Sequence, residues 1–377
     1  MQELELYIHI PFCVRKCYYC DFLSAPATEE IMTGYCQYLC QEMELRKNDP
    51  RIQGKEVDTI FIGGGTPSLL SVENLSLVTG SLRNNFTVVQ ESEFSLECNP
   101  GTVTREKLKC YRQLGVNRLS IGMQSAIDGE LVKLGRIHTY EEFRQTFHMA
   151  RDVGFTNINI DVMAAIPGQT VDSYKTTLKR VMELEPEHIS SYSLIIEEGT
   201  PFYERYADEP PVGEDTDREM YERTEELLAQ AGYERYEISN YAREGYSCKH
   251  NLKYWQRDEY LGLGLGASSF LEHERFSNVR SFDTYEGEVS AERVPLMETE
   301  TLTSEDEMAE FMYLGLRCMK GVSASEFEQC FGVKLKDIYG EVIEKLTGQG
   351  LLEGKGGRIA LTKKGIDVSN LVFAEFV

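Results

Sequence analysis

The sequence predicts an α/β protein: an open, partial barrel of six strand–helix units, (β/α)6 and TIM-like, with a C-terminal α+β region that ends in a winged-helix-like domain. Two observations carry this prediction. Short apolar strand patterns alternate with amphipathic helical patterns over the first 200 residues, which implies a parallel sheet with right-handed crossovers. Three helical patterns and a glycine-tipped hairpin then close the chain. Six units cannot close an eight-stranded barrel, so the barrel is expected to stay open, with its chemistry at the carboxyl ends of the strands.

The predicted strands are short apolar runs at Leu6–Ile10, Thr59–Gly63, Glu93–Cys98, Arg118–Met123, Asn157–Met163 and His188–Leu194. The predicted helices between them lie at residues 30–47, 71–85, 104–114, 139–153 and 171–184. Thr104 and Thr139 are expected to begin two of these helices, and Gly115 and Gly154 are expected to end them in the left-handed conformation.

The alternation stops near residue 200. A loop rich in acids and proline leads to a helix at about 215–231, a strand-like segment at Tyr233–Ser239 and an irregular aromatic stretch to about 290. Helices at 305–318, 324–331 and 335–349 precede the hairpin. We therefore predict three regions, which are the barrel at 1–205, a connecting α/β region at 206–300 and the winged-helix-like domain at 301–377.

Charge and hydropathy exclude several classes of function. Acidic residues outnumber basic ones by 62 to 39, for a net charge of −23, and such a surface repels nucleic acid. The third C-terminal helix carries Asp337, Glu341 and Glu344, which also argues against DNA binding. No apolar run approaches the 18 residues typical of a membrane span, and the N-terminus lacks the basic region of a signal peptide. We therefore expect a cytoplasmic protein without a transmembrane segment.

Three of the ten cysteines stand apart from the rest. Cys13, Cys17 and Cys20 form a Cys-x3-Cys-x2-Cys pattern directly after the first predicted strand, whereas Cys36 and Cys40 lie on a helical pattern that core packing explains. A zinc site commonly needs four ligands, and no fourth stands at metal-ligand spacing. Three thiolates on an iron–sulfur cubane leave one iron open to a small chelating molecule.

Further candidate ligand-binding groups follow the later strands. The glycine run Gly63-Gly64-Gly65 ends the second strand, where it lets backbone approach a ligand, and it does not match the G-x-G-x-x-G pattern of dinucleotide sites. Polar residues follow at the next three strands, namely Glu97, Gln124, Arg136 and Asp161. Glu97 as a helix cap and Arg136 as a surface ion pair are the structural alternatives. Asp161 interrupts an apolar strand, which is costly unless the carboxylate has a task.

CVRKCYYC resembles the cluster loop of the radical S-adenosylmethionine (radical SAM) superfamily. Together with YIHIPFC, GGGTPS, LECNP, RLSIGMQS and NIDVMAAIPGQT, it makes residues 4–200 similar to the oxygen-independent coproporphyrinogen III oxidase family. The resemblance implies a 4Fe–4S cluster on Cys13, Cys17 and Cys20, and S-adenosylmethionine at the open iron. The residues that match the family's S-adenosylmethionine contacts are Tyr7, Tyr19, Gly64, Gly65, Thr66, Glu97, Gln124, Arg136, Asp161 and Ile195.

The chain departs from the oxidases in one place. They carry a further cysteine two residues after the third, and here Asp21 and Phe22 follow Cys20. CDF instead resembles the haem chaperone branch of the family, HemW, as does an HNxxYW motif formed by His250, Asn251, Tyr254 and Trp255. That resemblance implies haem contact at the motif, where His250 can offer a neutral imidazole to the iron. Cys248, two residues away, is a rival iron ligand. The alternative is a satisfied buried histidine with an aromatic pair.

The expected function is that of a haem chaperone, which carries haem to an acceptor protein, membrane-bound or not. The rival hypothesis is a radical SAM enzyme, such as the coproporphyrinogen III oxidase, that cleaves S-adenosylmethionine to a 5′-deoxyadenosyl radical. The missing cysteine after Cys20 argues against the oxidase and not against radical chemistry in general. The sequence leaves open whether two chains pair as a homodimer.

Overall fold

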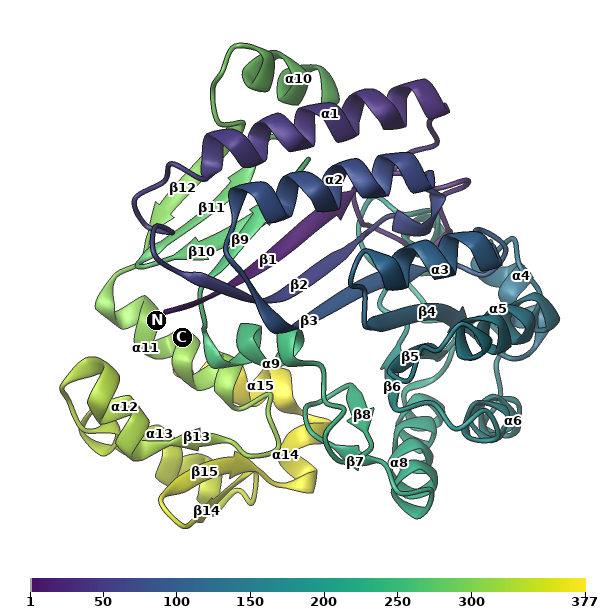
Figure 1. Cartoon of the computed structure of the whole chain (residues 1–377). Coiled ribbons are helices and arrows are strands. Elements are labelled where there is room, and N and C mark those ends of the chain that lie inside the picture. The colour runs from purple at the N-terminus through teal and green to yellow at the C-terminus, as the bar shows by residue number, and fades with distance from the viewer. Residues whose placement is uncertain (1) are drawn as a thin grey trace.

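A twelve-stranded sheet organises the first 300 residues of the computed structural model, which describes residues 2–377 and all of their side chains but that of Lys355 (Figure 1). Six consecutive parallel strands form its centre, in the order of the chain. They are β1 (Glu3–Ile10), β2 (Glu56–Gly64), β3 (Val88–Cys98), β4 (Arg118–Gln124), β5 (Ile158–Ala164) and β6 (His188–Ser193). The predicted α/β class with an open partial barrel of six parallel strands is confirmed.

Helices cover the outer face of these strands (Figure 1). They are α1 (Glu29–Arg46), α2 (Val72–Asn85), α3 (Arg105–Gln113), α4 (Asp128–Leu134), α5 (Tyr140–Asp152) and α6 (Val171–Met182), with a 3-10 turn η1 at Pro67–Leu69. The predicted helix starts are confirmed, because the Thr104 side chain accepts from the Lys107 amide and Thr139 forms a capping box with Glu142. The sequence analysis missed α4, whose seven residues are too few to show a helical period.

Residues 201–301 contribute further strands to the same sheet. Their helices are α7 (Pro201–Tyr206), α8 (Glu214–Gln230), α9 (Lys249–Gln256) and α10 (Phe282–Ser290). Their strands are β7 (Glu234–Arg235), β8 (Asn240–Ala242), β9 (Tyr260–Leu263), β10 (Ser268–Leu271), β11 (Glu274–Asn278) and β12 (Leu296–Thr301). β9 lies parallel to β1 and extends the sheet beyond the barrel, whereas β8 pairs antiparallel with β6.

The prediction of an irregular stretch up to about residue 290 is therefore wrong, because this stretch forms α9, β9, β10, β11 and α10. Glycines in β9 and directly after it hid the strand, because they have low strand propensity. Gly262 is needed there, since a Cβ atom at this position would lie 2.1 Å from the Ser268 carbonyl oxygen of β10. Of the predicted strand at Tyr233–Ser239, only the two-residue strand β7 forms, and it pairs with β8, which follows the predicted range.

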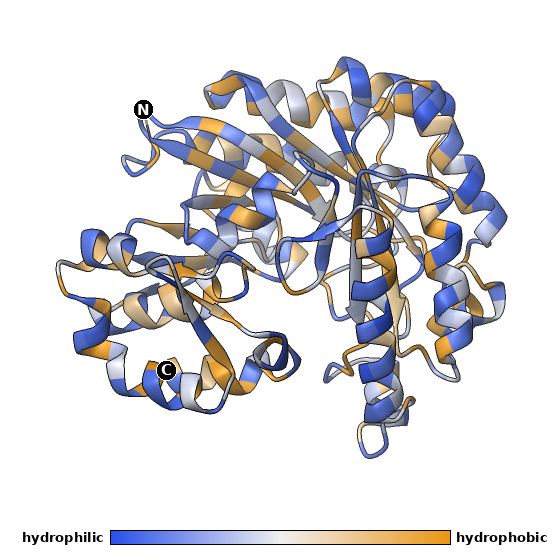
Figure 2. Cartoon of the chain, turned by 90° about the horizontal axis from the view of Figure 1, so that it is seen from below, coloured by the Kyte–Doolittle hydropathy of each residue, from blue (hydrophilic) through white to orange (hydrophobic). Residues whose placement is uncertain are grey.

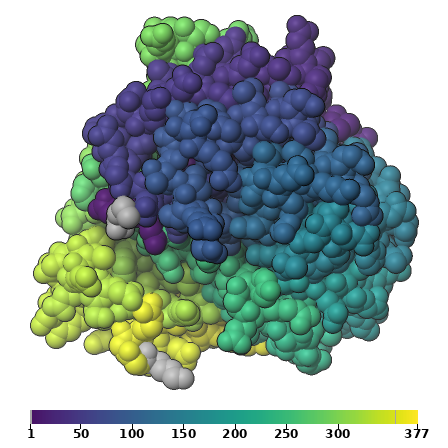
Figure 3. Space-filling view, in the orientation of Figure 1, coloured from purple at the N-terminus to yellow at the C-terminus, as the bar shows by residue number. Residues whose placement is uncertain are grey.

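The C-terminal residues pack around a core of their own. The elements are α11 (Ser304–Gly315), β13 (Val322–Ser323), α12 (Ala324–Phe331), α13 (Leu335–Gly348), β14 (Leu352–Lys355), β15 (Arg358–Leu361), α14 (Lys363–Asp367), α15 (Ser369–Phe373) and η2 (Ala374–Phe376). β15 lies between β13 and β14 in a separate sheet. Met312, Leu316 and Phe327 lie at the centre of this second core. In the space-filling view the C-terminal residues, yellow-green to yellow, lie at the lower left, below the purple and blue part of the chain (Figure 3).

The distribution of hydropathy follows this architecture. Polar residues dominate the outward faces of the helices, and apolar residues gather along the strands between them (Figure 2). Cys36 is fully buried in the main core, as its helical spacing predicts, and Cys40 lies half-buried on the same helix, with its thiol 3.8 Å from the Leu77 carbonyl oxygen. Within residues 2–377, no helix has the length and apolar character that crossing a bilayer requires.

Candidate functional site

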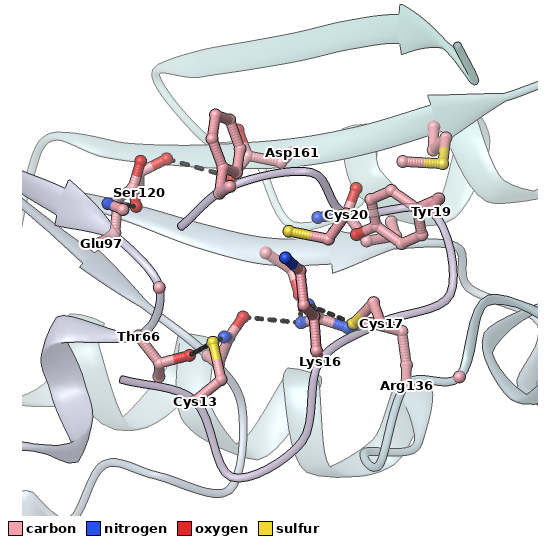
Figure 4. A pocket seen from close by; sticks show the side chains of 18 of the residues that line it. Cys13, Lys16, Cys17, Tyr19, Cys20, Thr66, Glu97, Ser120, Arg136 and Asp161 are labelled. Carbon is pink, nitrogen blue, oxygen red and sulfur yellow. Dashed lines mark hydrogen bonds between the residues drawn. The ribbon is translucent and has the colours of Figure 1, made fainter. Parts of the chain in front are cut away.

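A cavity of about 520 Å³ opens at the carboxyl ends of the six central strands (Figure 4). The loop after β1 contributes Cys13, Cys17 and Cys20 to its lining, and the ends of β2 and β4 contribute Thr66 and Gln124. This is the end of the sheet at which the sequence analysis placed the chemistry. The predicted residues that line the cavity are Cys13, Cys17, Tyr19, Cys20, Gly64, Gly65, Thr66, Glu97, Gln124, Arg136, Asp161, Ile195 and Asn251.

The three thiols lie on a loop that backbone hydrogen bonds hold at its start and at its middle. The Cys13 amide donates to the Ala25 carbonyl oxygen at 3.1 Å, and the Tyr18 amide donates to the Leu134 carbonyl oxygen at 3.0 Å. All three cysteines are free and half-buried, so their sulfur atoms are reachable from the cavity. The Cys13 Sγ lies 3.4 Å from the Thr66 hydroxyl, and Arg136 donates to the Cys17 Sγ at 3.9 Å (Figure 4).

The glycine run packs the end of β2 against the thiol loop. A Cβ atom at Gly65 would lie 2.6 Å from the Phe12 carbonyl oxygen, and one at Gly64 would lie 2.4 Å from the His9 ring. Gly64 also has a φ of +107°, which favours glycine. Packing within the protein therefore explains why glycines occupy this run, in addition to the close approach to a ligand that the sequence predicts.

Arg136 and Gln124 are held by neighbouring polar atoms at the cavity. Arg136 donates to the Asn99 Oδ1 and to the Gly122 carbonyl oxygen, both at 2.7 Å, so its guanidinium is part of the cavity wall and not a surface ion pair. Gln124 has a φ of +67°, an uncommon conformation for a residue other than glycine, and its side chain accepts from the Tyr192 hydroxyl at 3.2 Å. Strain held in place by packing at a cavity wall is a frequent mark of a binding site.

Two carboxyl groups face the same cavity from β3 and β5. Burial, with the nearby Asp161, raises the pKa of Glu97 to about 8, although the Gly64 amide donates to Glu97 at 3.0 Å. Burial also raises the pKa of Asp161, and this rise is opposed by donors from Asn159 at 2.7 Å and Ser120 at 3.1 Å. The helix-cap alternative for Glu97 is therefore not what the structure shows. Both groups offer oxygen atoms that can accept hydrogen bonds from ligand hydroxyls.

The structure does not bring every predicted residue to the cavity. Tyr7, His250, Tyr254 and Trp255 are not among the residues that line it. The Tyr7 hydroxyl lies 3.0 Å from the His9 Nδ1, and the His9 ring packs against Gly64 of the cavity lining. From the HNxxYW motif only Asn251 lines the cavity.

The motif lies on α9, which packs near the starts of the barrel strands. The His250 Nδ1 lies 2.8 Å from the Thr59 hydroxyl, and its Nε2 lies 2.9 Å from the Tyr254 hydroxyl. Its ring stacks on Phe61, with 5.3 Å between centroids. Burial, and then the charge of Arg118, lower the pKa of His250 to about 3, so the ring stays neutral. Iron ligation by His250 therefore requires one of two buried hydrogen bonds to break.

Cys248 and Trp255 are also occupied by contacts within the protein. The Cys248 thiol is fully buried and donates to Glu93 at 3.4 Å, and burial raises its pKa to about 12. The guanidinium of Arg317, which directly follows α11, lies 4.3 Å from the Trp255 ring centroid. The motif thus connects the base of the barrel with the C-terminal residues.

A chain of buried side chains that the sequence analysis missed joins the cavity to this helix. Asn159, the donor to Asp161, lies 2.6 Å from the His188 Nδ1, and the His188 Nε2 lies 2.8 Å from the Tyr236 hydroxyl. The Tyr236 hydroxyl in turn accepts from the Cys248 amide at 3.3 Å. Asn159 near the start of β5 and His188 at the start of β6 were the available sequence signal.

Glu5 is a buried acid beside the same helix, and it should make the stability of the protein depend on pH. Neither of its carboxyl oxygens has a hydrogen-bond partner within residues 2–377, and burial raises its pKa from 4.5 to about 10. Between these values the unfolded chain loses a proton that the folded protein keeps. Stability therefore falls as the pH rises from about 5 to 9, by at most about 1.4 kcal/mol per pH unit from this group.

Glu5→Gln is expected to remove this contribution, because the amide has nearly the same shape and no charge to bury. Urea unfolding of both proteins at several pH values measures it, as a difference in stability that grows in favour of the variant with pH. Glu91→Gln, at an exposed acid of β3, is the control and should keep the wild-type slope. Equal slopes for Glu5→Gln and the wild type would contradict the prediction.

Comparisons with known proteins identify two similar families and a similar solved structure. The model of the radical SAM superfamily matches residues 7–181, and that of the HemN C-terminal domain matches residues 302–368. A solved structure of coproporphyrinogen III oxidase (HemN) from Escherichia coli, described as a radical SAM enzyme, has a TM-score of 0.88 and 25% identity. The alignment covers 100% of this chain and 90% of that one.

Curated proteins named as the haem chaperone HemW are similar over most of their length. The protein of Lactococcus lactis is 36% identical over 374 residues, which are 98% of this chain and 96% of the relative. That of Bacillus subtilis is 36% identical over 376 residues, 98% of each. The Escherichia coli protein is 42% identical over 271 residues, 71% of this chain and 70% of the relative.

Proposed function

The chain belongs to the HemW family of haem chaperones, within the radical SAM superfamily, and on this basis we propose that it binds haem and delivers it to an acceptor protein. The observation that carries the proposal is the similarity to haem chaperones along nearly the whole chain, at 36% identity. Position 22 supports it, because Phe22 stands where the oxidases carry a further cysteine.

Cys13, Cys17 and Cys20 are proposed to hold a 4Fe–4S cluster, as the radical SAM family implies. The residues fit such a group: three free thiols come from one loop, they line one cavity, and soft thiolate ligands favour iron–sulfur clusters. When bound, the cluster supplies one-electron chemistry and an iron that can take a ligand from outside the protein. Thr66 and Arg136 contact two of the sulfur atoms and would orient the loop.

S-adenosylmethionine is proposed to bind against the polar wall of the cavity. Glu97 and Asp161 would accept hydrogen bonds from ribose hydroxyls, and Arg136 would pair with the methionine carboxylate. Gly64 and Gly65 let the end of β2 pack closely against the residues before the thiol loop. The remaining proposed contacts from the cavity lining are Tyr19, Thr66, Gln124 and Ile195. Tyr7 is also a proposed contact, although it lies behind the lining residues, beside His9.

The haem contacts at His250, Asn251, Tyr254 and Trp255 stay a prediction. Asn251 reaches the cavity, and the other three are engaged with Thr59, each other and Arg317. If His250 is the iron ligand, haem uptake must displace Thr59 or Tyr254 from its ring. His250→Ala would then lose haem uptake and keep its cluster.

Titration of haem into cluster-reconstituted protein without oxygen tests the proposed function. We expect saturable binding near one haem per chain, followed as a change in the Soret absorbance. No haem binding by protein that demonstrably holds its cluster would contradict the proposal. The enzyme hypothesis would then stand first, and release of 5′-deoxyadenosine after reduction with dithionite would be its measurement.

A further inference from the structure

The mouth of the cavity carries an unusual share of exposed apolar side chains. Within residues 2–377, seven large apolar side chains are more than half exposed, and four of these line this one cavity. The four, called here the mouth residues, are Val14 (54% exposed), Phe22 (62%), Ile137 (55%) and Ile195 (68%). They come from the loops that follow β1, α4 and β6, so three separate segments place apolar groups around one opening.

We propose that the mouth residues form the binding face for the haem macrocycle. The proposal rests on the proposed function, and it places haem outside the HNxxYW motif. Exposed apolar side chains gathered around a cavity mark a ligand or an interface, because water contact with such a patch costs free energy. Haem is flat and apolar over most of its area, and a shallow apolar rim with an aromatic side chain suits such a ligand.

The deeper wall suits a different ligand. Glu97, Arg136 and Asp161 make it polar, which fits the proposed S-adenosylmethionine and not a porphyrin face. The rim also offers two exposed cations, Arg15 and Lys16, directly after Val14. In a chain with a net charge of −23, these cations are the groups that can pair with the haem propionates. Asp21 and Glu197 also line the cavity, so the propionates are expected on the Arg15 side.

The mouth would hold haem without a strong iron ligand from the wall. His138 is the one histidine among the lining residues of the described chain; it is buried, and its Nε2 lies 3.3 Å from the Met123 carbonyl oxygen. His250 and Cys248 are buried on α9 with partners of their own. Contact through apolar surface, with the iron free on the outer side, allows an acceptor to take the iron as a ligand and remove the haem.

The test compares haem affinity in two double variants by titration without oxygen. Phe22→Ala/Ile137→Ala removes two mouth residues, neither of which is a proposed cluster or S-adenosylmethionine contact. Ile338→Ala/Leu371→Ala removes two exposed apolar side chains of the C-terminal residues and is the matched control. We expect at least a tenfold rise in the haem Kd for the mouth variant and less than a twofold change for the control. Iron content and S-adenosylmethionine binding should match the wild type in both.

Two further variants separate the outcomes. Phe22→Tyr keeps an aromatic ring at the mouth, and its haem affinity should stay within about threefold of the wild type. His250→Gln should bind haem with wild-type affinity. A mouth variant that binds haem as the wild type does would overturn the inference and leave the haem chaperone function standing. Loss of haem binding by His250→Gln, with wild-type haem binding by the mouth variant, would place the haem site at the HNxxYW motif. Absence of haem binding by the wild type would remove both the inference and the proposed function.

Discussion

Replacing Cys17 with serine is expected to yield a folded protein without its iron–sulfur cluster. Serine keeps the shape of the side chain, but its hydroxyl is a hard ligand that stays protonated, whereas the cluster needs a soft thiolate. The half-buried thiol contacts Arg136 at 3.9 Å and contributes little to the core, so the fold should not suffer. Iron and sulfide analysis after anaerobic reconstitution should fall from about four of each per chain to near zero.

Cys330→Ser is the matched control for this variant. Cys330 is an exposed free cysteine on α12, in the C-terminal residues, and its replacement should leave the iron content unchanged. Circular dichroism and the thermal midpoint should be the same for both variants and the wild type. A Cys17→Ser protein that keeps its full complement of iron would show that another group completes the site.

Removing the Glu93 carboxylate is expected to give the largest loss of stability. Its oxygens accept hydrogen bonds from the Cys248 thiol and from the amides of Lys249 and His250, so a side chain of β3 satisfies the free amides at the start of α9. It also lies within reach of the charge of the buried Arg118. Glu93→Ala leaves three donors and a buried cation without this partner, and we expect a loss of about 3 kcal/mol or more in urea unfolding.

Glu91→Ala tests whether this loss is specific. Glu91 is an exposed residue of the same strand, and its replacement should change the free energy of unfolding by less than about 0.5 kcal/mol. Glu93→Gln keeps an acceptor for the amides but removes the charge, so its loss of free energy of unfolding should lie between those of Glu93→Ala and Glu91→Ala. Equal stability of Glu93→Ala and Glu91→Ala would show that α9 is held by its other contacts.

A fold shared with an oxidase does not settle the chemistry of this chain. The solved oxidase superposes with a TM-score of 0.88 over the whole chain, so the two proteins share their fold. By resemblance, the oxidase pattern has a CxC ending at the place where Asp21 and Phe22 follow Cys20 in this chain. Phe22 also belongs to the exposed mouth of the cavity, which connects that difference to the proposed haem face.

Local features of the sequence predicted the barrel and most of its lining. The alternation of strands and helices, the caps at Thr104 and Thr139, and the thiol loop are all encoded within short windows, because propensity and hydrogen bonding near in sequence fix them. The same is true of Glu97 and Gln124, since polar residues at the ends of parallel strands must meet at one edge. Asp161 lies within β5 and Arg136 follows α4, and both also line the cavity.

Long-range packing decided what the sequence could not. His250 looks like a free loop ligand in the sequence, yet α9 folds under the barrel and encloses it between Thr59, Phe61 and Tyr254. β9 joins β1 across more than 250 residues, and no local pattern records such a partner. The same holds for the mouth, because Val14, Phe22, Ile137 and Ile195 come from separate loops.

The sequence by itself thus determined the parallel barrel, the three thiols of one loop and the polar groups at the strand ends. The tertiary structure alone decided which of the candidate residues face the cavity and which are enclosed by partners. The physical reason is that strand and helix formation depends on neighbours along the chain. The exposure of a side chain, its pKa and its free hydrogen-bonding capacity depend instead on the residues that folding brings against it.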